Sequence, residues 1–185
     1  MKKVLLSAAV VLAAICIYAF ATPAAKPAAD KAENPLKWYT FEEAVALNAK
    51  APKKMFIDVY TDWCGWCKKM DANTFSDPKV AAYLAENFYP VKFNAEQKED
   101  IGFKGHTLKY MPNAGRRGVH ELAVSLLEGQ LGYPSFVYLD ENQDRISISP
   151  GYKDANTMLT ELKFIGGNHF KTMSYEQFVD KKGNK

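Results

Sequence analysis

Residues 63–68 have the sequence WCGWCK and follow a mostly apolar run, residues 55–60, after two intervening residues. The two cysteines, Cys64 and Cys67, are separated by two residues, so their thiols can close a small disulfide and open it again. Where a strand passes into a helix, the first thiol lies at the positive end of the helix dipole, which lowers its pKa from about 8.5 into the range of roughly 3.5–7.5. Because the thiolate is the nucleophile of thiol–disulfide exchange, this stretch indicates redox chemistry.

Length and composition are those of a globular protein. The chain has 185 residues, of which 48% are hydrophobic and 24% are charged. This length suggests one domain of ordinary size with extensions, and the apolar content suffices for a packed core. We therefore predict a folded domain at residues 38–185, preceded by two segments of a different character.

The N-terminus has the pattern of a secretory signal peptide at residues 1–21. A positive segment, MKK, is followed by an apolar run at residues 4–20 and by a small-x-small cleavage pattern, AFA, at residues 19–21. An uncleaved anchor in the inner membrane is the alternative, although this run is at the short limit of the roughly 17–25 residues that span a bilayer. Lipid attachment at Cys16 is disfavoured because the bulky Ile15 precedes it. We therefore expect an exported, periplasmic protein.

Removal of residues 1–21 would leave a chain with little net charge and one pair of cysteines. The cleavage removes two lysines and no acidic residue, so the formal charge falls from +3 to +1. We therefore expect neither nucleic acid nor an acidic membrane surface as a partner. The cleavage also removes Cys16 and leaves Cys64 and Cys67, which suits an oxidising compartment in which a further thiol would be a hazard.

Capping and periodicity signals predict helices and strands after a flexible tether, rich in Ala, Pro and Lys, at residues 22–37. Thr40 and Glu43 form a capping box, and Asp77-Pro78 is an N-cap followed by a proline in the first turn. We predict helices at residues 41–50, 64–74, 78–87, 119–128, 155–165 and from 175, and strands at 55–60, 89–94, 136–139 and 145–149. Residues 95–132 form a polar, glycine-containing insertion in which we predict one helix.

The order of these elements, with CxxC after a buried strand, resembles the thioredoxin fold over residues 41–165. This is an α/β fold in which a central mixed sheet is flanked by helices. The resemblance is carried further by residues at family positions: Asp58, Lys92, Pro134 and Gly151. The sequence is similar to exported bacterial thioredoxin-like proteins of the disulfide reductase and cytochrome c biogenesis type, with an insertion before the proline.

Cys64 is the expected nucleophile and Cys67 the buried resolving thiol, with Cys64 the more exposed of the two. A purely structural disulfide is one alternative, but so short a loop removes little chain entropy. A zinc site is another, but zinc needs four ligands, and His106, His120 and His169 form no matching pair. We therefore expect no metal, and no cofactor other than the Cys64–Cys67 disulfide.

Asp58 and Lys92 are candidate catalytic groups. Asp58 lies six residues before Cys64 in an apolar strand, where a carboxylate is unfavourable unless it has a partner or a protonation role. With a raised pKa it would accept the proton of Cys67 as a general base. Lys92 is the candidate partner of Asp58. The alternatives are a half-exposed Asp58 that makes one hydrogen bond, and a solvated Lys92 at a strand edge.

Five residues are expected to line the substrate side of the disulfide: Trp63, Gly65, Trp66, Tyr133 and Pro134. The two tryptophans would form an apolar collar, although core packing is the alternative for Trp63. The resemblance implies a cis peptide bond before Pro134, and a substrate chain that meets the backbone of Tyr133. X-Pro bonds are cis in only about 5–6% of cases in folded proteins, so this expectation depends on the resemblance.

These features together predict an exported thiol–disulfide oxidoreductase that reduces protein disulfides through Cys64 and Cys67. Its partners would be disulfide-bonded proteins and a membrane thiol–disulfide electron donor that recharges the pair. The alternatives are a disulfide oxidase or isomerase, and a non-catalytic protein-binding module of the same fold. Polar residues of the insertion are candidates for partner contacts, but we favour solvated loop side chains at His106, Arg116, Arg117 and His120.

Overall fold

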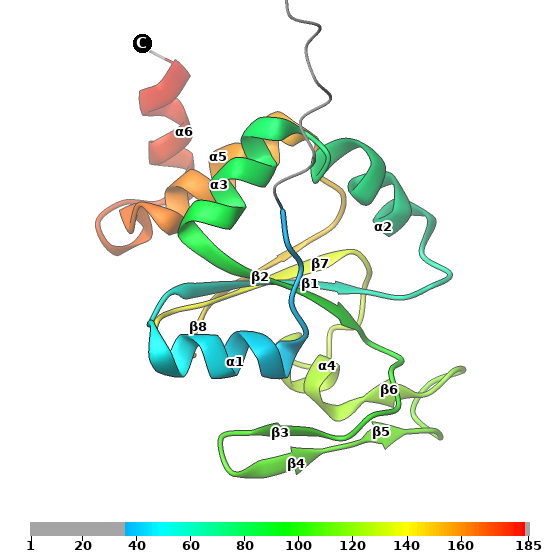
Figure 1. Cartoon of the computed structure of the whole chain (residues 1–185). Helices are drawn as coiled ribbons and strands as arrows, with labels where there is room; N and C mark the ends of the chain where they lie inside the picture. The colour runs from blue at the N-terminus through cyan, green and yellow to red at the C-terminus, as the bar shows by residue number, and fades with distance from the viewer. Residues whose placement is uncertain (1–35, 184–185) are drawn as a thin grey trace, which may run out of the picture. The chain divides into compact units, whose positions relative to one another are not determined.

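The computed structural model describes residues 36–183, and Figure 1 shows the arrangement of their helices and strands. The predicted signal peptide at residues 1–21 and nearly all of the predicted tether lie outside the described residues. Leu36 is already buried, with 8% of its surface exposed, and it packs in the same hydrophobic cluster as Phe56. The folded domain therefore begins no later than Leu36, two residues before the predicted boundary.

A four-stranded mixed sheet forms the centre of the described domain, with the strand order β2-β1-β7-β8. In that order the strands are Phe88–Asn94, Lys54–Tyr60, Ser135–Leu139 and Arg145–Pro150. Strand β1 pairs parallel with β2 and antiparallel with β7, and β7 pairs antiparallel with β8. This is the predicted mixed sheet. Its central strands β1 and β7 are buried almost throughout because both faces of the sheet are covered.

Helices cover both faces of the sheet, as the predicted fold requires (Figure 1). Helix α1 lies on one face and α3 and α5 lie on the other, and a short 3₁₀ turn follows α5: Phe41–Lys50, Pro78–Asn87, Ala155–Gly166 and His169–Lys171. Side chains of β1 alternate between the two faces. Ile57 packs in the cluster that contains Phe41 of α1, whereas Phe56 packs in the cluster that contains Leu84 of α3.

Capping boxes start α1, as predicted, and also the terminal helix α6 (Tyr175–Gly183). Thr40 Oγ1 accepts the N–H of Glu43 at 3.2 Å, and the carboxylate of Glu43 accepts the N–H of Thr40 at 2.9 Å. Ser174 and Gln177 are paired in the same way before α6. No helix in residues 36–183 combines the length and the apolar character needed to cross a membrane.

The insertion contains two small antiparallel sheets in addition to the predicted helix. Its elements β3, β4, β5, β6 and α4 are Ile101–Phe103, His106–Leu108, Tyr110–Met111, Val119–His120 and Glu121–Leu126. The helix predicted at residues 119–128 begins two residues later, because His120 pairs with Tyr110 and its side chain caps α4. The Nδ1 atom of His120 accepts the N–H of Leu122 at 3.1 Å.

The insertion packs against the α1 side of the domain core. Phe103 of β3 meets Phe41 of α1 edge to face, with ring centroids 5.0 Å apart. Gly118 is required before β6, since its φ is +77° and a Cβ there would lie 2.1 Å from the hydroxyl oxygen of Tyr110. The first contact joins the insertion to α1, and the second fixes the end of the β5–β6 loop within the insertion.

Candidate active site

Cys64 and Cys67 form a disulfide at the start of α2 (Gly65–Lys69), with their Cα atoms 5.3 Å apart. Cys64 is the N-cap residue, and its sulfur accepts the backbone N–H of Cys67 at 3.0 Å. Both cysteines are buried, with 4% of Cys64 and 2% of Cys67 exposed, so the predicted difference in exposure is small in the disulfide form. The helix continues through a π-helical turn, Met70–Thr74, which completes the predicted helical stretch.

This geometry favours a thiolate at Cys64 once the disulfide is reduced. A backbone N–H directed at the sulfur and the first turn of a helix both stabilise negative charge. The first turn carries no acidic residue that would oppose this effect. Gly65 begins the helix, and no atom lies within 4 Å of the place where a Cβ would be, so the space beside this residue is open.

A cis peptide bond joins Tyr133 to Pro134, as expected from the resemblance. The carbonyl of Pro134 accepts the N–H of Gly151 at 2.8 Å, and Gly151 has a φ of +88°, in the left-handed region that favours glycine. The ring of Tyr133 lies edge-on to Trp63, with the ring centroids 6.0 Å apart. The cis-proline loop therefore lies beside the residue that precedes Cys64.

The two tryptophans of the motif are exposed by 52% and 56%, so the alternative that Trp63 packs in the core is wrong. Trp63 donates its indole N–H to Glu96 of the insertion at 2.8 Å. Trp66 instead contacts Tyr152, with ring centroids 5.3 Å apart, and Lys69 Nζ lies 4.9 Å from the centre of the Trp66 ring. The collar thus meets the insertion through one tryptophan and the loop after β8 through the other.

Asp58 and Lys92 are register partners on β1 and β2, and they form an ion pair in which Lys92 Nζ lies 2.6 Å from Asp58 Oδ2. Asp58 is 1% exposed, so the half-exposed alternative is wrong, and the pairing excludes a freely solvated Lys92. The same Nζ contacts the carboxylate of Asp71 in the π-helical turn and lies 5.0 Å from the ring centre of Tyr60. Lys92 therefore links β2 to β1 and to the helix that carries the cysteines.

Burial raises the pKa of the Asp58 carboxyl to about 6, although the Lys92 ammonium opposes the shift and the Asp71 carboxylate adds to it. Burial also disfavours the charged form of Lys92, but Asp58 and Asp71 outweigh this effect and raise the pKa of the lysine. Asp58 thus titrates near neutral pH beside a charged lysine. In this range a carboxylate can both take up and release a proton.

The second carboxylate oxygen of Asp58, Oδ1, is buried and has no hydrogen-bond partner within the described part of the chain. The hydroxyl oxygen of Thr61, directly after β1, is buried without a partner in the same way. Roughly 90% or more of buried polar groups are paired, so each exception calls for an explanation such as a catalytic role or an ordered water. Asp58 Oδ1 is therefore free to receive a proton or a hydrogen bond.

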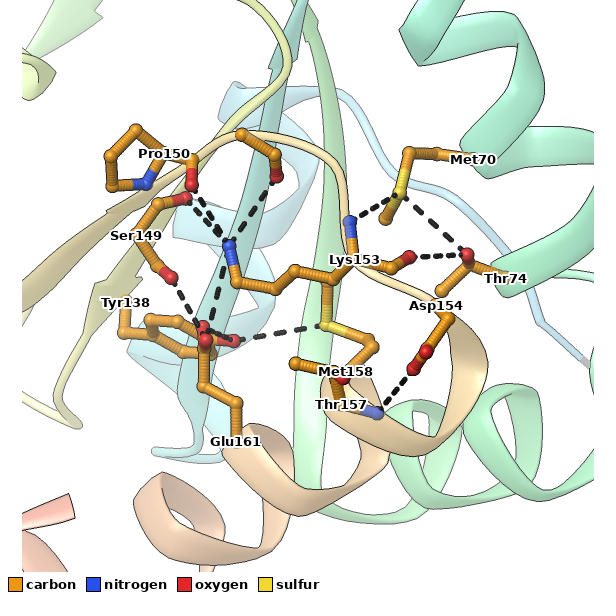
Figure 2. A network of polar contacts seen from close by, with 11 residues as sticks. Met70, Thr74, Tyr138, Ser149, Pro150, Lys153, Asp154, Thr157, Met158 and Glu161 are labelled. Carbon is orange, nitrogen blue, oxygen red and sulfur yellow. Dashed lines mark hydrogen bonds and ion pairs between the residues drawn. The ribbon is translucent and has the colours of Figure 1, made fainter. Parts of the chain in front are cut away.

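A second polar network holds the loop between β8 and α5 (Figure 2). Lys153 Nζ lies 3.4, 3.2 and 3.4 Å from the carbonyl oxygens of Ser149, Pro150 and Gly151. It also lies 3.9 Å from Oε2 of Glu161, which accepts the hydroxyl of Ser149 at 2.8 Å. The side chain of Lys153 is only 10% exposed. One largely buried ammonium thus binds three consecutive backbone carbonyls and a carboxylate of α5.

The backbone of Lys153 contacts the helix that carries the cysteines. Its N–H donates to Sδ of Met70 at 3.3 Å, and its carbonyl accepts the hydroxyl of Thr74 at 2.7 Å, as Figure 2 shows. Gly151 and Tyr152, the two preceding residues, contact the cis-proline and the second tryptophan of the motif. Lys153 therefore fixes the loop on which both contacts depend.

Sequence reasoning missed three residues that reach the site: Asp71, Glu96 and Lys153. Asp71 had a detectable signal, because it lies four residues after Cys67 and residues at this spacing share a helix face. Glu96 and Lys153 reach the site through tertiary packing, and neither lies at a recognisable spacing from the cysteines. Their contributions become visible only once the insertion and the β8–α5 loop have been placed.

His120 is fully buried, so the prediction of a solvated loop residue is wrong for this histidine. Its Nδ1 accepts the N–H of Leu122, and its Nε2 lies 3.0 Å from the carbonyl oxygen of Glu99. Nε2 therefore carries the proton and donates it to Glu99. The other candidates of the insertion are exposed: His106, Arg116 and Arg117. No group of three or more His, Cys, Asp and Glu side chains gathers in the described residues to hold a metal ion.

A helix-capping disulfide beside a cis-proline, on a sheet of this strand order, is the arrangement of the thioredoxin superfamily, and the chain has that fold. The chain belongs to the family described as Thioredox_DsbH, protein of unknown function DUF255, whose family model matches residues 27–162. A thioredoxin-fold protein from Helicobacter pylori superposes with a TM-score of 0.55 and 16% sequence identity, over 72% of this chain and 86% of that chain. This structural similarity shows the fold.

Two curated relatives match shorter segments of the chain. Spermatogenesis-associated protein 20 of Homo sapiens is 32% identical over 71 residues, which are 38% of this chain and 9% of that protein. Thiol:disulfide interchange protein DsbD of Vibrio vulnificus (strain CMCP6) is 42% identical over 45 residues, which are 24% of this chain and 8% of that protein. The chain thus spans about a tenth of the length of these relatives.

Proposed function

We propose that this chain is an exported thiol–disulfide oxidoreductase that reduces disulfides of protein substrates through Cys64 and Cys67. The observation that carries the proposal is the placement of Cys64, whose sulfur caps α2 and accepts the N–H of Cys67 at 3.0 Å. Membership of a DsbH-type thioredoxin family and similarity to a thiol:disulfide interchange protein support it.

The exchange proceeds in two steps. In the reduced protein, the Cys64 thiolate attacks one sulfur of the substrate disulfide, forms a mixed disulfide and expels the other substrate sulfur as a thiolate, which takes a proton from solvent. Cys67 then loses its proton and attacks the Cys64 sulfur, and the second substrate thiolate leaves. The Cys64–Cys67 disulfide of the structure results, and two electrons have passed to the substrate.

Asp58 is the proposed base that takes the Cys67 proton. Its carboxyl is buried, has a pKa raised to about 6 by that burial, and has Oδ1 free, so it can receive a proton near neutral pH. Lys92 binds Oδ2 at 2.6 Å and leaves Oδ1 as the open atom, which makes it a positioning residue. Both residues thus serve the second step of the exchange rather than the first.

The substrate chain meets residues around the disulfide, of which the two tryptophans and Gly65 are exposed, Tyr133 is half-buried and Pro134 is buried. The proposed contact set is Trp63, Gly65, Trp66, Tyr133 and Pro134. The exposed side chains of Trp63 and Trp66 supply apolar contact area, and Gly65 adds no side chain between them. The fixed cis-proline loop offers a backbone edge to an extended substrate segment.

Export and the direction of exchange are also part of the proposal. The signal-peptide pattern at residues 1–21 supports export to the periplasm, with an anchored N-terminus as the alternative. The resemblance to exported reductases favours reduction, and a membrane thiol–disulfide electron donor would then recharge the pair. A disulfide oxidase or isomerase is the alternative, because the N–H bond to Cys64 stabilises the reduced form and so makes the disulfide more oxidising.

Trapping of the mixed disulfide tests the proposed roles. In Cys67→Ser the nucleophile remains but no thiol resolves the intermediate, so a disulfide-bonded peptide should accumulate as a covalent adduct. Cys64→Ser is the matched control and should trap little, because Cys67 lies inside the helix and lacks the N-cap position that stabilises a thiolate at Cys64. Cys16→Ser in both variants removes the third thiol of the chain. Equal trapping by both variants, or by neither, would contradict the assignment.

A further inference from the structure

A groove lies beside the cysteines, lined by Trp63, Tyr133 and residues of the β5–β6 loop, and its volume is about 440 Å³. Trp63 and Leu131, which belong to its lining, expose 52% and 43% of their surfaces. Trp63 precedes Cys64, and Tyr133 precedes Pro134. The groove therefore begins at two residues of the proposed substrate contact set, Trp63 and Tyr133.

Two arginines of the β5–β6 loop, Arg116 and Arg117, give the groove its charge. Both are exposed, and neither forms an ion pair with a carboxylate of residues 36–183. The guanidinium of Arg117 lies 5.7 Å from the ring centre of Trp63. The acidic side chain in the lining, Glu96, has its Oε1 bound by the indole of Trp63. The groove therefore presents excess positive charge next to apolar surface.

The loop that carries the arginines is held by contacts of its own. The hydroxyl of Tyr110 donates to the carbonyl of Arg117 at 2.5 Å and packs over Gly118, where a Cβ would collide with it. The N–H of Ala114 donates to the carbonyl of Met111 at 3.3 Å. A loop that is already ordered loses little freedom on binding, and guanidinium groups match the geometry of a carboxylate.

We infer that this groove binds an extended segment of the disulfide-bonded protein substrate, one that carries an acidic side chain within a few residues of its cysteine. The inference rests on the proposed function and names its substrate class. Arg116 and Arg117 bind the carboxylate, and an apolar side chain of the same segment packs on Trp63 and Leu131. Glutathione disulfide fits less well, because it has carboxylates but no apolar side chain for these two walls.

Two disulfide-bonded peptides test the groove, identical except for glutamate or glutamine three residues from the cysteine. The full chain, with Cys16→Ser, is reduced with dithiothreitol and freed of it, and the second-order rate constant for cleavage of each peptide is measured at low salt. We expect the glutamate peptide to react about fivefold faster, the effect that two exposed ion pairs give together. The ratio should approach unity at about 1 M salt, because salt screens exposed charges.

Matched variants locate this preference in the groove. The double variant Arg116→Gln/Arg117→Gln should cleave the glutamate and glutamine peptides at the same rate. The control Lys50→Gln/Lys79→Gln removes the same charge from exposed positions outside the groove lining and should keep the preference. Bis(2-hydroxyethyl) disulfide has no charge and should react equally with the parent chain and both variants, which verifies that the cysteines are intact in each protein.

The outcomes separate the inference from the proposed function. If bis(2-hydroxyethyl) disulfide and both peptides stay uncleaved, the oxidoreductase function is wrong. If they are cleaved but the two peptides react at the same rate, or the preference survives in the arginine variant, the groove inference is wrong and the function stands. If cleavage of glutathione disulfide depends on the arginines more strongly than cleavage of the glutamate peptide, the groove serves a small disulfide and the inference is overturned.

Discussion

Lys92 Nζ lies 2.6 Å from Oδ2 of Asp58 and leaves Oδ1 of that buried carboxylate without a hydrogen-bond partner in the described residues. The pair follows from the register of β1 and β2, which places the two residues side by side. Burial raises the pKa of Asp58 to about 6. A group that titrates near neutral pH, on the strand that leads to Cys64, makes both stability and exchange depend on pH.

The free energy of unfolding should fall as the pH rises from about 4 to about 6. In this window Asp58 loses its proton in the unfolded chain, where its pKa is 3.8, but keeps it in the folded chain up to about 6, so the folded state binds more protons. Above both pKa values the free energy of unfolding stays lower by a constant amount, about 1–3 kcal/mol. Asp58→Asn should remove this pH-dependent decrease in stability, as measured by urea unfolding between about pH 4 and 8.

A matched control for this measurement is Asp180→Asn, which replaces an exposed carboxyl of α6. Its pH profile of stability should follow that of the unchanged protein. A profile for Asp58→Asn that also runs parallel to the unchanged protein would show that Asp58 does not have a raised pKa in the folded state.

Asp58→Asn should also slow the second step of exchange. Without a proton acceptor for Cys67, release of a thiol from a mixed disulfide on Cys64 should slow by about 10²-fold at neutral pH, the lower end of what general bases contribute. In the unchanged protein the rate of this step should rise with pH through about 6. Stopped-flow measurement of the two steps separates them, since the attack by Cys64 should change little.

The control is Asp71→Asn, which removes the other carboxylate on Lys92 but keeps Asp58. It should slow thiol release much less. If Asp58→Asn slows the attack by Cys64 as much as the release step, Asp58 is not the base for Cys67.

Lys153→Met should weaken the cis-proline loop without touching the cysteines. Methionine is similar in length to the aliphatic part of lysine but cannot donate to the three carbonyls at the end of β8 and the start of the β8–α5 loop. Stability should fall by about 1–3 kcal/mol, and Gly151, whose N–H binds Pro134, should loosen. Cleavage of a disulfide-bonded peptide should slow several-fold, whereas the rate of cleavage of bis(2-hydroxyethyl) disulfide should stay unchanged.

Lys79→Met, at an exposed position, is the control for Lys153→Met. Equal slowing of Lys153→Met with both substrates would argue against a positioning role for Lys153.

Gly118→Ala should destabilise the insertion. The added Cβ would lie 2.1 Å from the hydroxyl oxygen of Tyr110, at a residue whose φ is +77°, so the ring or the loop must move. We expect a loss of about 1–3 kcal/mol in urea unfolding. Gly102→Ala in β3, where no atom lies within 4 Å of an added Cβ, is the matched control and should be close to neutral. A similar loss for both variants would contradict the packing of Tyr110 over Gly118.

The part of the fold around the cysteines could be predicted because its signals are local. Each of these signals spans only a few consecutive residues: the apolar run at residues 55–60, the CxxC spacing, and the capping box of Thr40 and Glu43. The contact between Asp58 and Lys92 joins distant segments. The resemblance to thioredoxins makes Lys92 a candidate partner of Asp58, with a solvated lysine as the alternative, and the structure shows the pair.

The insertion and the β8–α5 loop could not be predicted in the same way. Strands β5 and β6 have two residues each, too few for a periodic pattern, and their pairing depends on Gly118 and the ring of Tyr110. His120 looked like a polar loop residue, but both its ring nitrogens bind backbone groups and allow its burial. Lys153 binds three backbone carbonyl groups, and because every residue has such a group, no sequence pattern predicts these contacts.

The equilibrium reduction potential of the Cys64–Cys67 pair tests the central claim most directly. The full chain with Cys16→Ser is equilibrated in glutathione buffers of known potential, and the reduced fraction is measured. Thioredoxin-fold proteins span values from about −270 mV for a reductant to about −120 mV for a strong oxidant. The proposed reductase predicts a value near −270 mV. A value near −120 mV would contradict it and make the protein an oxidase, and a pair that does not exchange with glutathione would contradict a redox function altogether.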